Sequence, residues 1–233
     1  MAHSGHFFGM GGLINQALTE CREDLRKKLQ SYYTWYNWIV MIKNIIFDIG
    51  GVIAEEVNGR ALTHLTVTEQ EQISDLIYYK SPGFIEVLLG NESSADYSAK
   101  MIEKYPNLKR EIGFLFDPKN VPVTYPIKQE ILDLLYKLHG AYKIYFLSDT
   151  MDISYDYLEN ILQDFDGGAY SFQEHLKKPN PVFFEVLLNR YHLDPTETIF
   201  FDDKEKNVVA AQNLGMKAVV FTSIDDLTNA LEN

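Results

Sequence analysis

The sequence predicts an α/β protein in which a parallel sheet lies between two layers of helices and carries a small helical insertion. After residue 41, short apolar runs of strand length alternate with longer amphipathic stretches of helical length. Strands separated by helices pair in parallel through right-handed crossovers. A block from about residue 55 to 125 interrupts this alternation with helical patterns and no convincing buried strand. We therefore expect a core of residues 41–54 and 126–233, with a helical insertion of residues 55–125.

The first 40 residues differ from the rest of the chain. The start is rich in Gly and His, and apolar residues then recur at helical spacing, namely Ile14, Leu18, Cys21, Leu25 and Leu29. We expect residues 1–40 to form an N-terminal extension that contains one amphipathic helix. The pattern leaves the role of this extension open.

The first strand of the core is expected at the start of the apolar run 45–53, as four to five residues that end where the Gly50-Gly51 pair forces a tight turn. A buried strand of this kind presents Asp48 at the carboxyl edge of a parallel sheet, where open α/β folds bind their ligands. Taken alone, Asp48 has an equally plain role as the cap of the following turn.

The remaining elements follow from periodicity and from helix start and stop signals. Within the insertion, helices are expected near 69–80, 82–90, 93–104 and 107–115. In the core, the expected order is a helix ending at Gly140, strand 143–148, helix 152–163, a short segment at 169–172, a helix after Asn180, strand 198–201, helix 206–214, strand 217–221 and helix 223–231.

Bulk properties limit the classes of function. The 233 residues, 46% of them hydrophobic and 23% charged, suit one medium domain with a small insert. A net charge of −12 without a basic patch argues against a nucleic-acid partner. The chain has no apolar run of about 18 residues, which argues against a membrane span, and no signal-peptide pattern. With a single cysteine, Cys21, these features predict a cytoplasmic protein; its oligomeric state stays open.

Polar residues follow three of the predicted strands. Asp48 follows the first strand, Ser148-Asp149-Thr150 end the second, and Asp202-Asp203 end another, while Lys177-Lys178 precede a helix. Each has an ordinary explanation, because serines end strands, acids cap helices and lysines are usually solvated. Carboxyl ends of parallel strands share one edge of a sheet, however, so we expect these groups to converge.

Phosphoryl transfer through an aspartyl-phosphate needs this combination of groups. A carboxylate attacks phosphorus and forms a covalent intermediate that water then hydrolyses. Oxygen ligands favour Mg²⁺, which Asp48 and Asp202 would bind. A hydroxyl and a lysine neutralise the phosphoryl oxygens. Asp203 and Asn207 would orient the ligands of the metal.

These residues resemble the motifs of the haloacid dehalogenase superfamily of hydrolases. The matching segments, in the order and spacing of that family from about residue 42 to 222, are 47–52, 147–150, 178–181 and 201–203 with Asn207. The resemblance implies a Rossmann-like core with a helical C1 cap at 55–125. It implies catalysis by Asp48 and Lys178, substrate binding by Ser148, Asp149 and Lys178, and a Mg²⁺ ion held by Asp48, the backbone carbonyl of Gly50 and Asp202.

The Asp-x-Gly-Gly-Val form of the first motif is most similar to the branch with bacterial sugar-phosphate phosphatases such as glucose-1-phosphatases. This implies a small phosphorylated metabolite, with a sugar phosphate as the leading type of substrate. The substrate itself cannot be read from the motifs.

Two positions depart from the family pattern. Most phosphatases of the family carry an acid–base aspartate where this chain has Gly50, and general acid–base catalysis contributes on the order of 10²–10⁴-fold. Glu55, Glu56 or a water could take that role. Asp149 stands where this branch more often has asparagine, and a further negative charge would weaken phosphate binding unless it faces away.

We therefore expect a Mg²⁺-dependent phosphatase and keep two alternatives open. A 2-haloacid dehalogenase also lacks the second aspartate, but it uses no metal, and the Asp202-Asp203 pair favours the phosphatase. A catalytically degenerate domain retained for binding is the other alternative, which Gly50 and Asp149 leave room for.

Overall fold

The computed structural model describes residues 27–28, 41–55, 65–77 and 81–232. The chain divides into two compact units, Met1–Met41 and Ile42–Asn233. In the first unit, Lys27 and Lys28 are helical. The rest of the amphipathic helix expected there lies outside the described residues.

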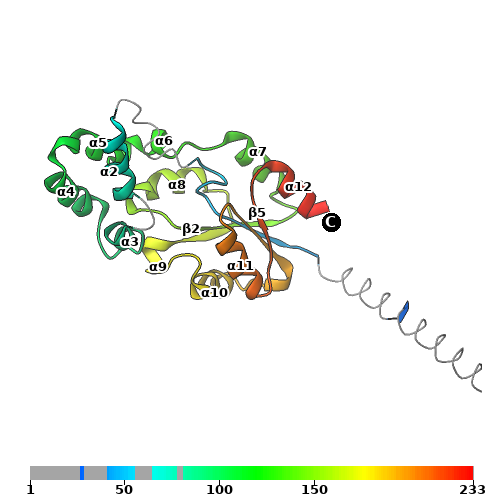
Figure 1. Cartoon of the computed structure of the whole chain (residues 1–233). Helices are drawn as coiled ribbons and strands as arrows, with labels where there is room; N and C mark the ends of the chain where they lie inside the picture. Colours follow the sequence, from blue (N-terminus) through cyan, green and yellow to red (C-terminus); the bar gives the residue numbers. More distant parts are fainter. Residues whose placement is uncertain (1–26, 29–40, 56–64, 78–80, 233) are drawn as a thin grey trace, which may run out of the picture. The chain divides into compact units, whose positions relative to one another are not determined.

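The second unit is built on a five-stranded parallel sheet, as expected, in the order β3-β2-β1-β4-β5 (Figure 1). Its strands are β1 (Asn44–Phe47), β2 (Lys143–Ser148), β3 (Gly167–Tyr170), β4 (Thr198–Asp202) and β5 (Lys217–Val220). The central strand β1 is buried on both faces, which explains its continuous apolar run. The α/β fold with helices on both faces of a parallel sheet is thereby confirmed.

Two apolar clusters cover the two faces of the sheet. Along β1, Ile45 and Phe47 point to one face and Ile46 to the other, as the two-residue period of a strand requires. The first face packs against α7 (Gln129–Leu138), α8 (Tyr155–Ile161) and α12 (Ile224–Glu232). The second packs against α10 (Pro181–Arg190) and α11 (Glu205–Asn213). Figure 1 shows these two groups of helices above and below the sheet.

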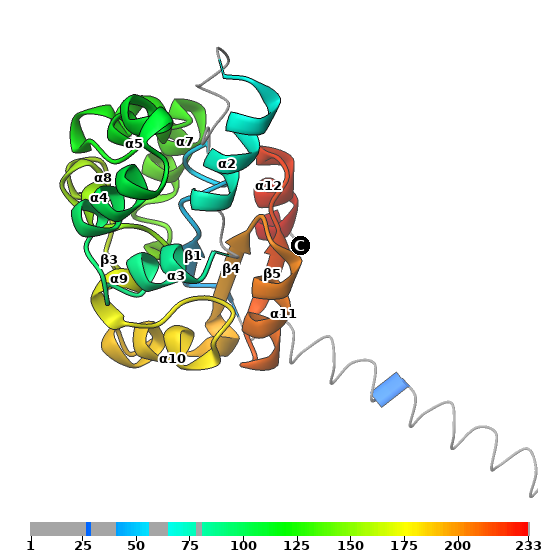
Figure 2. The same ribbon diagram turned by 60° about the vertical axis from the view of Figure 1, so that its left-hand side comes forward.

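A third cluster belongs to the helices between β1 and α7. These are α2 (Val67–Ile77), α3 (Pro82–Leu88), α4 (Ser94–Lys104), α5 (Lys109–Leu115) and α6 (Val121–Thr124), with short 3₁₀ turns at Pro106–Leu108 and Pro118–Asn120. We call residues 67–124 the helical segment. Its buried apolar residues form their own core around Tyr97, Phe84 and Ile112. The segment lies beyond the carboxyl ends of the strands (Figures 1 and 2).

The first strand is shorter than its apolar run suggests. β1 ends at Phe47, and the buried residues Ile49, Val52 and Ile53 lie in a compact turn instead. Gly51 adopts a φ of 79° there, a left-handed conformation that other residues rarely adopt. The turn thus keeps the apolar residues buried while it releases Asp48 from the strand.

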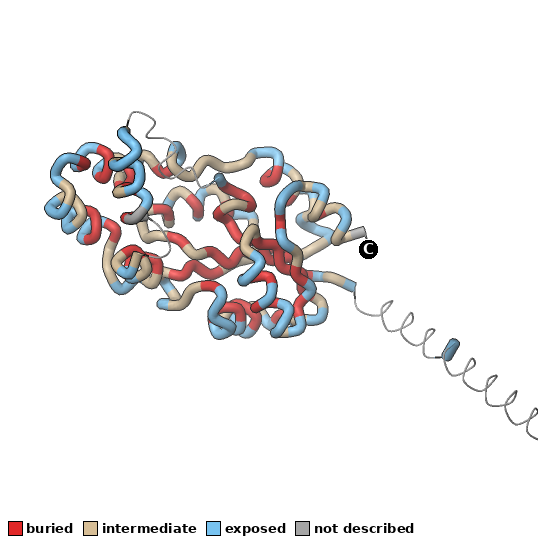
Figure 3. Tube along the Cα trace, viewed as in Figure 1, coloured by how far each residue is buried: buried red, intermediate tan, exposed pale blue. Residues whose placement is uncertain are grey.

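Figure 3 shows buried backbone concentrated in the strands and in the inward faces of the helices around them. Among the described residues, none of the helices is both long enough and apolar enough to span a membrane. The core also contains the short helix α9 (Ser171–Glu174) after β3 and the 3₁₀ turns Asp152–Ser154 and Pro195–Glu197.

Candidate active site

The carboxyl ends of β1, β2 and β4 bring the polar residues together at one edge of the sheet. In the register of the sheet, Phe47 lies opposite both Phe146 and Phe201. One residue further on, Asp48 therefore lies level with Asp202, the last residue of β4, and with Leu147, which precedes Ser148 at the end of β2. The backbone N–H of Asp48 also donates to the carbonyl of Phe201 over 2.8 Å, which extends the strand pairing by one residue.

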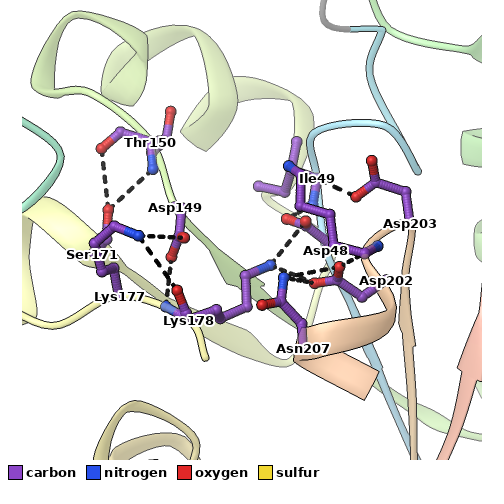
Figure 4. A network of polar contacts seen from close by, with 11 residues as sticks. Asp48, Ile49, Asp149, Thr150, Ser171, Lys177, Lys178, Asp202, Asp203 and Asn207 are labelled. Atoms are coloured by element: carbon purple, nitrogen blue, oxygen red, sulfur yellow. Dashed lines mark hydrogen bonds and ion pairs between the residues drawn. The ribbon is translucent and has the colours of Figure 1, made fainter. Parts of the chain in front are cut away.

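Lys178 joins the two aspartates. Its Nζ lies 2.8 Å from Oδ2 of Asp48 and 2.8 Å from Oδ2 of Asp202, as Figure 4 shows. The lysine is only 1% exposed. Burying an ammonium group is favourable only where opposite charges and hydrogen bonds surround it, and the two carboxylates meet that need.

Asp202 receives additional hydrogen bonds. The Asn207 side-chain amide lies 2.9 Å from each carboxylate oxygen, and the backbone N–H of Lys204 donates to Oδ1 over 2.8 Å. Asn207 lies in the first turn of α11, so the start of this helix orients the acid at the end of β4. The role expected for Asn207, to orient a metal ligand, stays a prediction that these bonds support.

The two carboxyl groups differ in their proton affinity. Burial raises the pKa of Asp48 well above its ordinary value of 3.8, although the Lys178 ammonium lowers it. Asp202 is also buried, but its bonds to Lys178 and to donors on the 204–207 segment outweigh burial, so its pKa lies below 3.8. Within the ion-free site, a proton is therefore held more readily by Asp48 than by Asp202.

A third acid completes a possible metal centre. Carboxylate oxygens of Asp48, Asp202 and Asp203 all lie within 4.8 Å of one another. Hard oxygen donors in this arrangement suit Mg²⁺, and a divalent cation would oppose the effect of burial on Asp48. The Asp203 carboxylate occupies the space that a side chain at Gly51 would need, with its Cγ 2.6 Å from an ideal Cβ there. Position 51 therefore requires glycine for two reasons: the backbone is left-handed there, and the Asp203 carboxylate leaves no room for a side chain.

Gly50 is buried in the turn after Asp48 and has no side chain that could transfer a proton. Its expected role as a carbonyl ligand stays a prediction. Glu55 is exposed, with its backbone N–H bonded to the carbonyl of Pro126, and Glu56 lies outside the described residues.

Ser148 lies in this site with an unused hydroxyl. The residue is fully buried, and within the part of the chain that the structure describes its Oγ has no hydrogen-bond partner. A buried hydroxyl without a partner costs stability, by about 1–3 kcal/mol in general. A substrate oxygen would supply the missing partner.

Asp149 contacts the loop that carries Lys178, and its expected role in substrate binding stays a prediction. Its Oδ1 accepts the backbone N–H of Lys178 over 2.9 Å, and its Oδ2 lies 3.9 Å from Nζ of Lys177. Burial raises the pKa of Asp149, against the opposing effect of Lys178. The Asp149 carboxylate therefore holds the backbone at Lys178 next to the end of β2 (Figure 4).

Two further contacts were not foreseen from the sequence. The Ser171 hydroxyl accepts the backbone N–H of Thr150 over 3.0 Å and donates to its carbonyl over 3.2 Å, which ties the loop after β2 to the start of α9. Lys128 donates to the carbonyl of Gly51 over 2.8 Å and holds the turn after β1. Serine and lysine at such positions carry no sequence signal of their own, because the contacts depend on the tertiary fold.

The family model of haloacid dehalogenase-like hydrolases matches residues 42–215. Among curated proteins, the D-ribitol-5-phosphate phosphatase of Bacteroides thetaiotaomicron is 26% identical over 189 residues, which is 76% of this chain and 90% of that protein. The phosphoglycolate phosphatase of Vibrio vulnificus strain YJ016 is 23% identical over 75% of this chain and 81% of its own length.

Solved structures show the same fold. A haloacid dehalogenase family enzyme of Bacteroides thetaiotaomicron, in complex with magnesium and inorganic phosphate, has a TM-score of 0.67 at 24% identity, covering 81% of this chain and 98% of its own. The L-2-haloacid dehalogenase of Xanthobacter autotrophicus has a TM-score of 0.58 at 15% identity, covering 82% of this chain and 83% of its own.

Proposed function

Because this chain belongs to the haloacid dehalogenase-like hydrolase family and is a phosphatase of that family, we propose that it hydrolyses a small phosphomonoester with Mg²⁺ and a covalent intermediate on Asp48. The observation that carries this proposal is the Lys178 ammonium, which lies 2.8 Å from both Asp48 and Asp202 at the edge of the sheet. The Lys178 ammonium thereby connects the proposed nucleophile, Asp48, to the proposed metal ligand Asp202.

In the first step, an oxygen of the Asp48 carboxylate attacks phosphorus and the bond from phosphorus to the leaving oxygen breaks. The leaving alkoxide takes up a proton. In the second step, water attacks the aspartyl-phosphate, which releases inorganic phosphate and restores the carboxylate. The hydrogen bond from the N–H of Ile49 to Oδ1 of Asp48, 2.7 Å long, supports this role because it fixes the orientation of the carboxylate.

Lys178 and Ser148 would hold the phosphoryl oxygens. Charge spreads over these oxygens in the transition state, and preorganised donors stabilise it without reorganising. The buried ammonium and the partnerless buried hydroxyl of Ser148 are donors of this kind. Asp149 would act indirectly, through its bond to the backbone of Lys178.

Mg²⁺ would be held by Asp48 and Asp202, with Asp203 beside them and the carbonyl of Gly50 as a further oxygen ligand. The closeness of the three carboxylates supports this assignment. When bound, the ion supplies positive charge that offsets the repulsion between the carboxylates and an anionic substrate.

The source of the leaving group's proton separates the classes of substrate. An anomeric sugar phosphate leaves with little protonation, whereas a polyol phosphate, such as the substrate named for the Bacteroides thetaiotaomicron relative, leaves as a poor alkoxide. Gly50 offers no proton, so slow turnover of primary phosphates is expected unless water or Glu55 supplies it. We propose a sugar or polyol phosphate as the substrate, with the helical segment acting as the cap that selects it.

A phosphate-release assay over sugar, polyol and nucleotide monophosphates, with and without EDTA, tests this function. We expect turnover that EDTA abolishes and Mg²⁺ restores, and no turnover by Asp48→Asn. Asp96→Asn, which removes an exposed carboxylate from α4, serves as the matched control and should retain the rate of the wild type.

The same assay includes 2-chloropropionate, because 2-haloacid dehalogenases, like this chain, have no aspartate at the position of Gly50. Chloride release, or phosphate release that EDTA leaves unchanged, would contradict the proposal. So would an Asp48→Asn variant that still turns over.

A further inference from the structure

Two loops at the carboxyl edge of the sheet carry the substrate-binding groups. We call residues 148–154, which run on from the last residue of β2, and residues 170–178, which run on from the last residue of β3, the two site loops. They are bonded to each other by Ser171, which both accepts from and donates to the backbone of Thr150. They are bonded again by Asp149, which accepts the N–H of Lys178. A displacement of one loop would therefore also move the other.

One short turn of the helical segment, residues 89–94 between α3 and α4, contacts both site loops. The carbonyl of Leu89 lies 2.8 Å from Nδ1 of His175 at the end of α9. Gly90 has a φ of 66° and packs so closely on Phe172 that a Cβ would overlap the carbonyl of Phe172. Figures 1 and 2 both show α3 beside α9.

The third contact is an ionic cap on α4. The backbone N–H of Ser94 donates to both carboxylate oxygens of Asp152, over 3.2 and 3.3 Å, and the Ser94 hydroxyl donates to Oδ1. Ser94 is fully buried. The first N–H groups of a helix have no partner within the helix, and a carboxylate there is also favoured by the helix dipole.

Asp152 differs from an ordinary cap because it comes from another part of the chain. The local cap of α4 is Ser93, which accepts the N–H of Asp96 over 3.0 Å and belongs to the helical segment itself. Asp152 instead lies in the first site loop, four residues after Ser148, where its Oδ1 also accepts the N–H of Ile153. Met151 and Ile153, on either side of it, pack against the apolar core of the helical segment.

We propose that Asp152 is a positioning residue, which by capping α4 fixes the helical segment on the two site loops and so holds Ser148 and Lys178 in place against Asp48. Its kinetic consequence rests on the proposed function, which gives Ser148 and Lys178 their roles. The contact acts on the loops through their backbone, so Asp152 itself does not touch the reacting atoms.

The test compares the full-length variants Asp152→Ala, Asp152→Asn, Ser94→Ala and the double variant Asp152→Ala/Ser94→Ala. Misplacement of catalytic groups by about 1 Å costs up to roughly 10²-fold, so we expect Asp152→Ala to lower kcat by about 10- to 100-fold. Asparagine still offers an acceptor to Ser94 and should restore most of this loss. If Asp152 acts through Ser94, the double variant should be no slower than Asp152→Ala alone.

Ser93→Ala is the matched control. It removes the local cap from the same helix end and lowers the stability of α4, but it leaves the contact to the site loops intact. It should therefore leave kcat unchanged. An equal loss of kcat in Ser93→Ala would overturn the proposal, because the effect would then follow from the stability of α4 alone.

Amide hydrogen exchange gives a readout that does not require activity. Asp152→Ala should speed exchange across residues 148–154 and 170–178, whereas Ser93→Ala should speed it only in α4. If the wild-type protein releases no phosphate from any substrate, the proposed function fails, and the exchange comparison alone decides the positioning role. Unchanged exchange in the site loops of Asp152→Ala would refute it.

Discussion

At the scale of single residues, the charge of the site depends on Lys178. Its one positive charge faces two carboxylates, and burial makes the remaining negative charge costly, which is why the pKa of Asp48 is raised. Burial alone would lower the pKa of Lys178, but both acids raise it above its ordinary value of 10.5, so the ammonium stays charged. With Asp203 included, these four groups carry a net charge of −2, which a divalent cation would bring to 0. The site would then no longer repel a phosphate dianion.

Ser148→Ala should separate activity from stability. Loss of a preorganised donor to a charged transition state costs on the order of 10²-fold in rate. The hydroxyl is buried without a partner in the described structure, so its removal should leave the free energy of unfolding unchanged or raise it by up to about 1 kcal/mol. Phosphate-release kinetics and denaturant unfolding on the same preparations check both parts.

Thr198→Val is the control for this prediction. Thr198 is also fully buried, but its hydroxyl donates to the carbonyl of Asp194 over 2.7 Å at the opposite end of β4. Its loss should lower the free energy of unfolding by about 1 kcal/mol and leave the rate unchanged. A Ser148→Ala variant that unfolds more easily and keeps its rate would assign the hydroxyl a structural role instead.

The sequence predicts which site residues meet where their positions at strand ends are enough to bring them together. Asp48, Ser148 and Asp202 each end or follow a strand, so parallel pairing was enough to predict that they converge. For Asp149, the family resemblance implies substrate binding, and that role stays a prediction. The contact of its carboxylate with the N–H of Lys178 depends on how a loop 29 residues away folds back, which no local pattern encodes.

At the scale of elements, strand and helix order followed from periodicity, whereas their ends did not. The apolar run 45–53 continues past the end of β1 because the turn around Gly51 is itself buried. Apolar character shows burial rather than strand geometry, so the end of the strand is set by φ at Gly51 and by the Asp203 carboxylate that packs there.

Two helical glycines should respond oppositely to alanine. Gly113 in α5 has no atom within 4 Å of an added Cβ, so Gly113→Ala should stabilise the protein by about 0.5–1 kcal/mol through helix propensity. At Gly83 in α3, an added Cβ would lie 2.8 Å from Cε2 of Tyr97. That ring is buried and its hydroxyl is bonded to the carbonyl of Leu76 over 2.7 Å, so it cannot easily move.

Gly83→Ala should therefore destabilise the protein by about 1–3 kcal/mol, the usual cost of overpacking. Chemical denaturation of both variants against the wild type measures the two differences. Equal effects of the two substitutions would show that Tyr97 yields, and would contradict the packing found around α3.

Asp166 should make the stability of the sheet depend on pH. Its carboxylate accepts from Nζ of Lys143 over 2.6 Å and from the N–H of Ile144 over 2.9 Å, which joins the start of β2 to the turn before β3. Burial raises the pKa of Asp166, but these bonds outweigh it, so the pKa lies below the ordinary 3.8. A lowered pKa means that the stabilisation is complete above about pH 4 and is lost as the pH falls through the folded-state value.

Asp166→Asn should lower the free energy of unfolding by about 1 kcal/mol at pH 7. The difference from the wild type should shrink as the pH falls below 4, because the wild-type carboxyl is then protonated as well. Urea unfolding at pH 7, 5 and 3.5 follows this change. Glu103→Gln, which removes an exposed carboxylate from α4, should show no such difference, and a gap for Asp166→Asn that stays constant with pH would refute the assignment.

At the scale of the whole molecule, the site is assembled from segments that lie far apart in the sequence, and each of these segments belongs to the unit Ile42–Asn233. Asp48, Ser148, Lys178 and Asp202 are all in this unit, as are the three apolar clusters. The family model also begins at residue 42. Charge and composition could exclude classes of partner, but they carry no information about which metabolite the helical segment admits.

A chain that begins at Met41 should therefore keep the activity of the full chain. The chain is bonded to the sheet from Lys43 onward, because its N–H donates to the carbonyl of Glu197 over 2.8 Å and its Nζ lies 2.6 Å from the carboxylate of Glu197. Removal of residues 1–40 leaves these bonds intact. We expect kcat/KM to stay within about twofold and the free energy of unfolding within about 0.5 kcal/mol, the range of changes away from packed sites.

Phosphate release and urea unfolding of both chains measure these quantities, and sedimentation of each shows whether its state of association changes. A drop in kcat/KM with unchanged unfolding would mean that residues 1–40 contribute to the site, and a drop in stability would mean that they belong to the fold. Either result would contradict the division of the chain at Met41, because a unit that carries all of the proposed catalytic groups and its own apolar cores should not need the preceding residues.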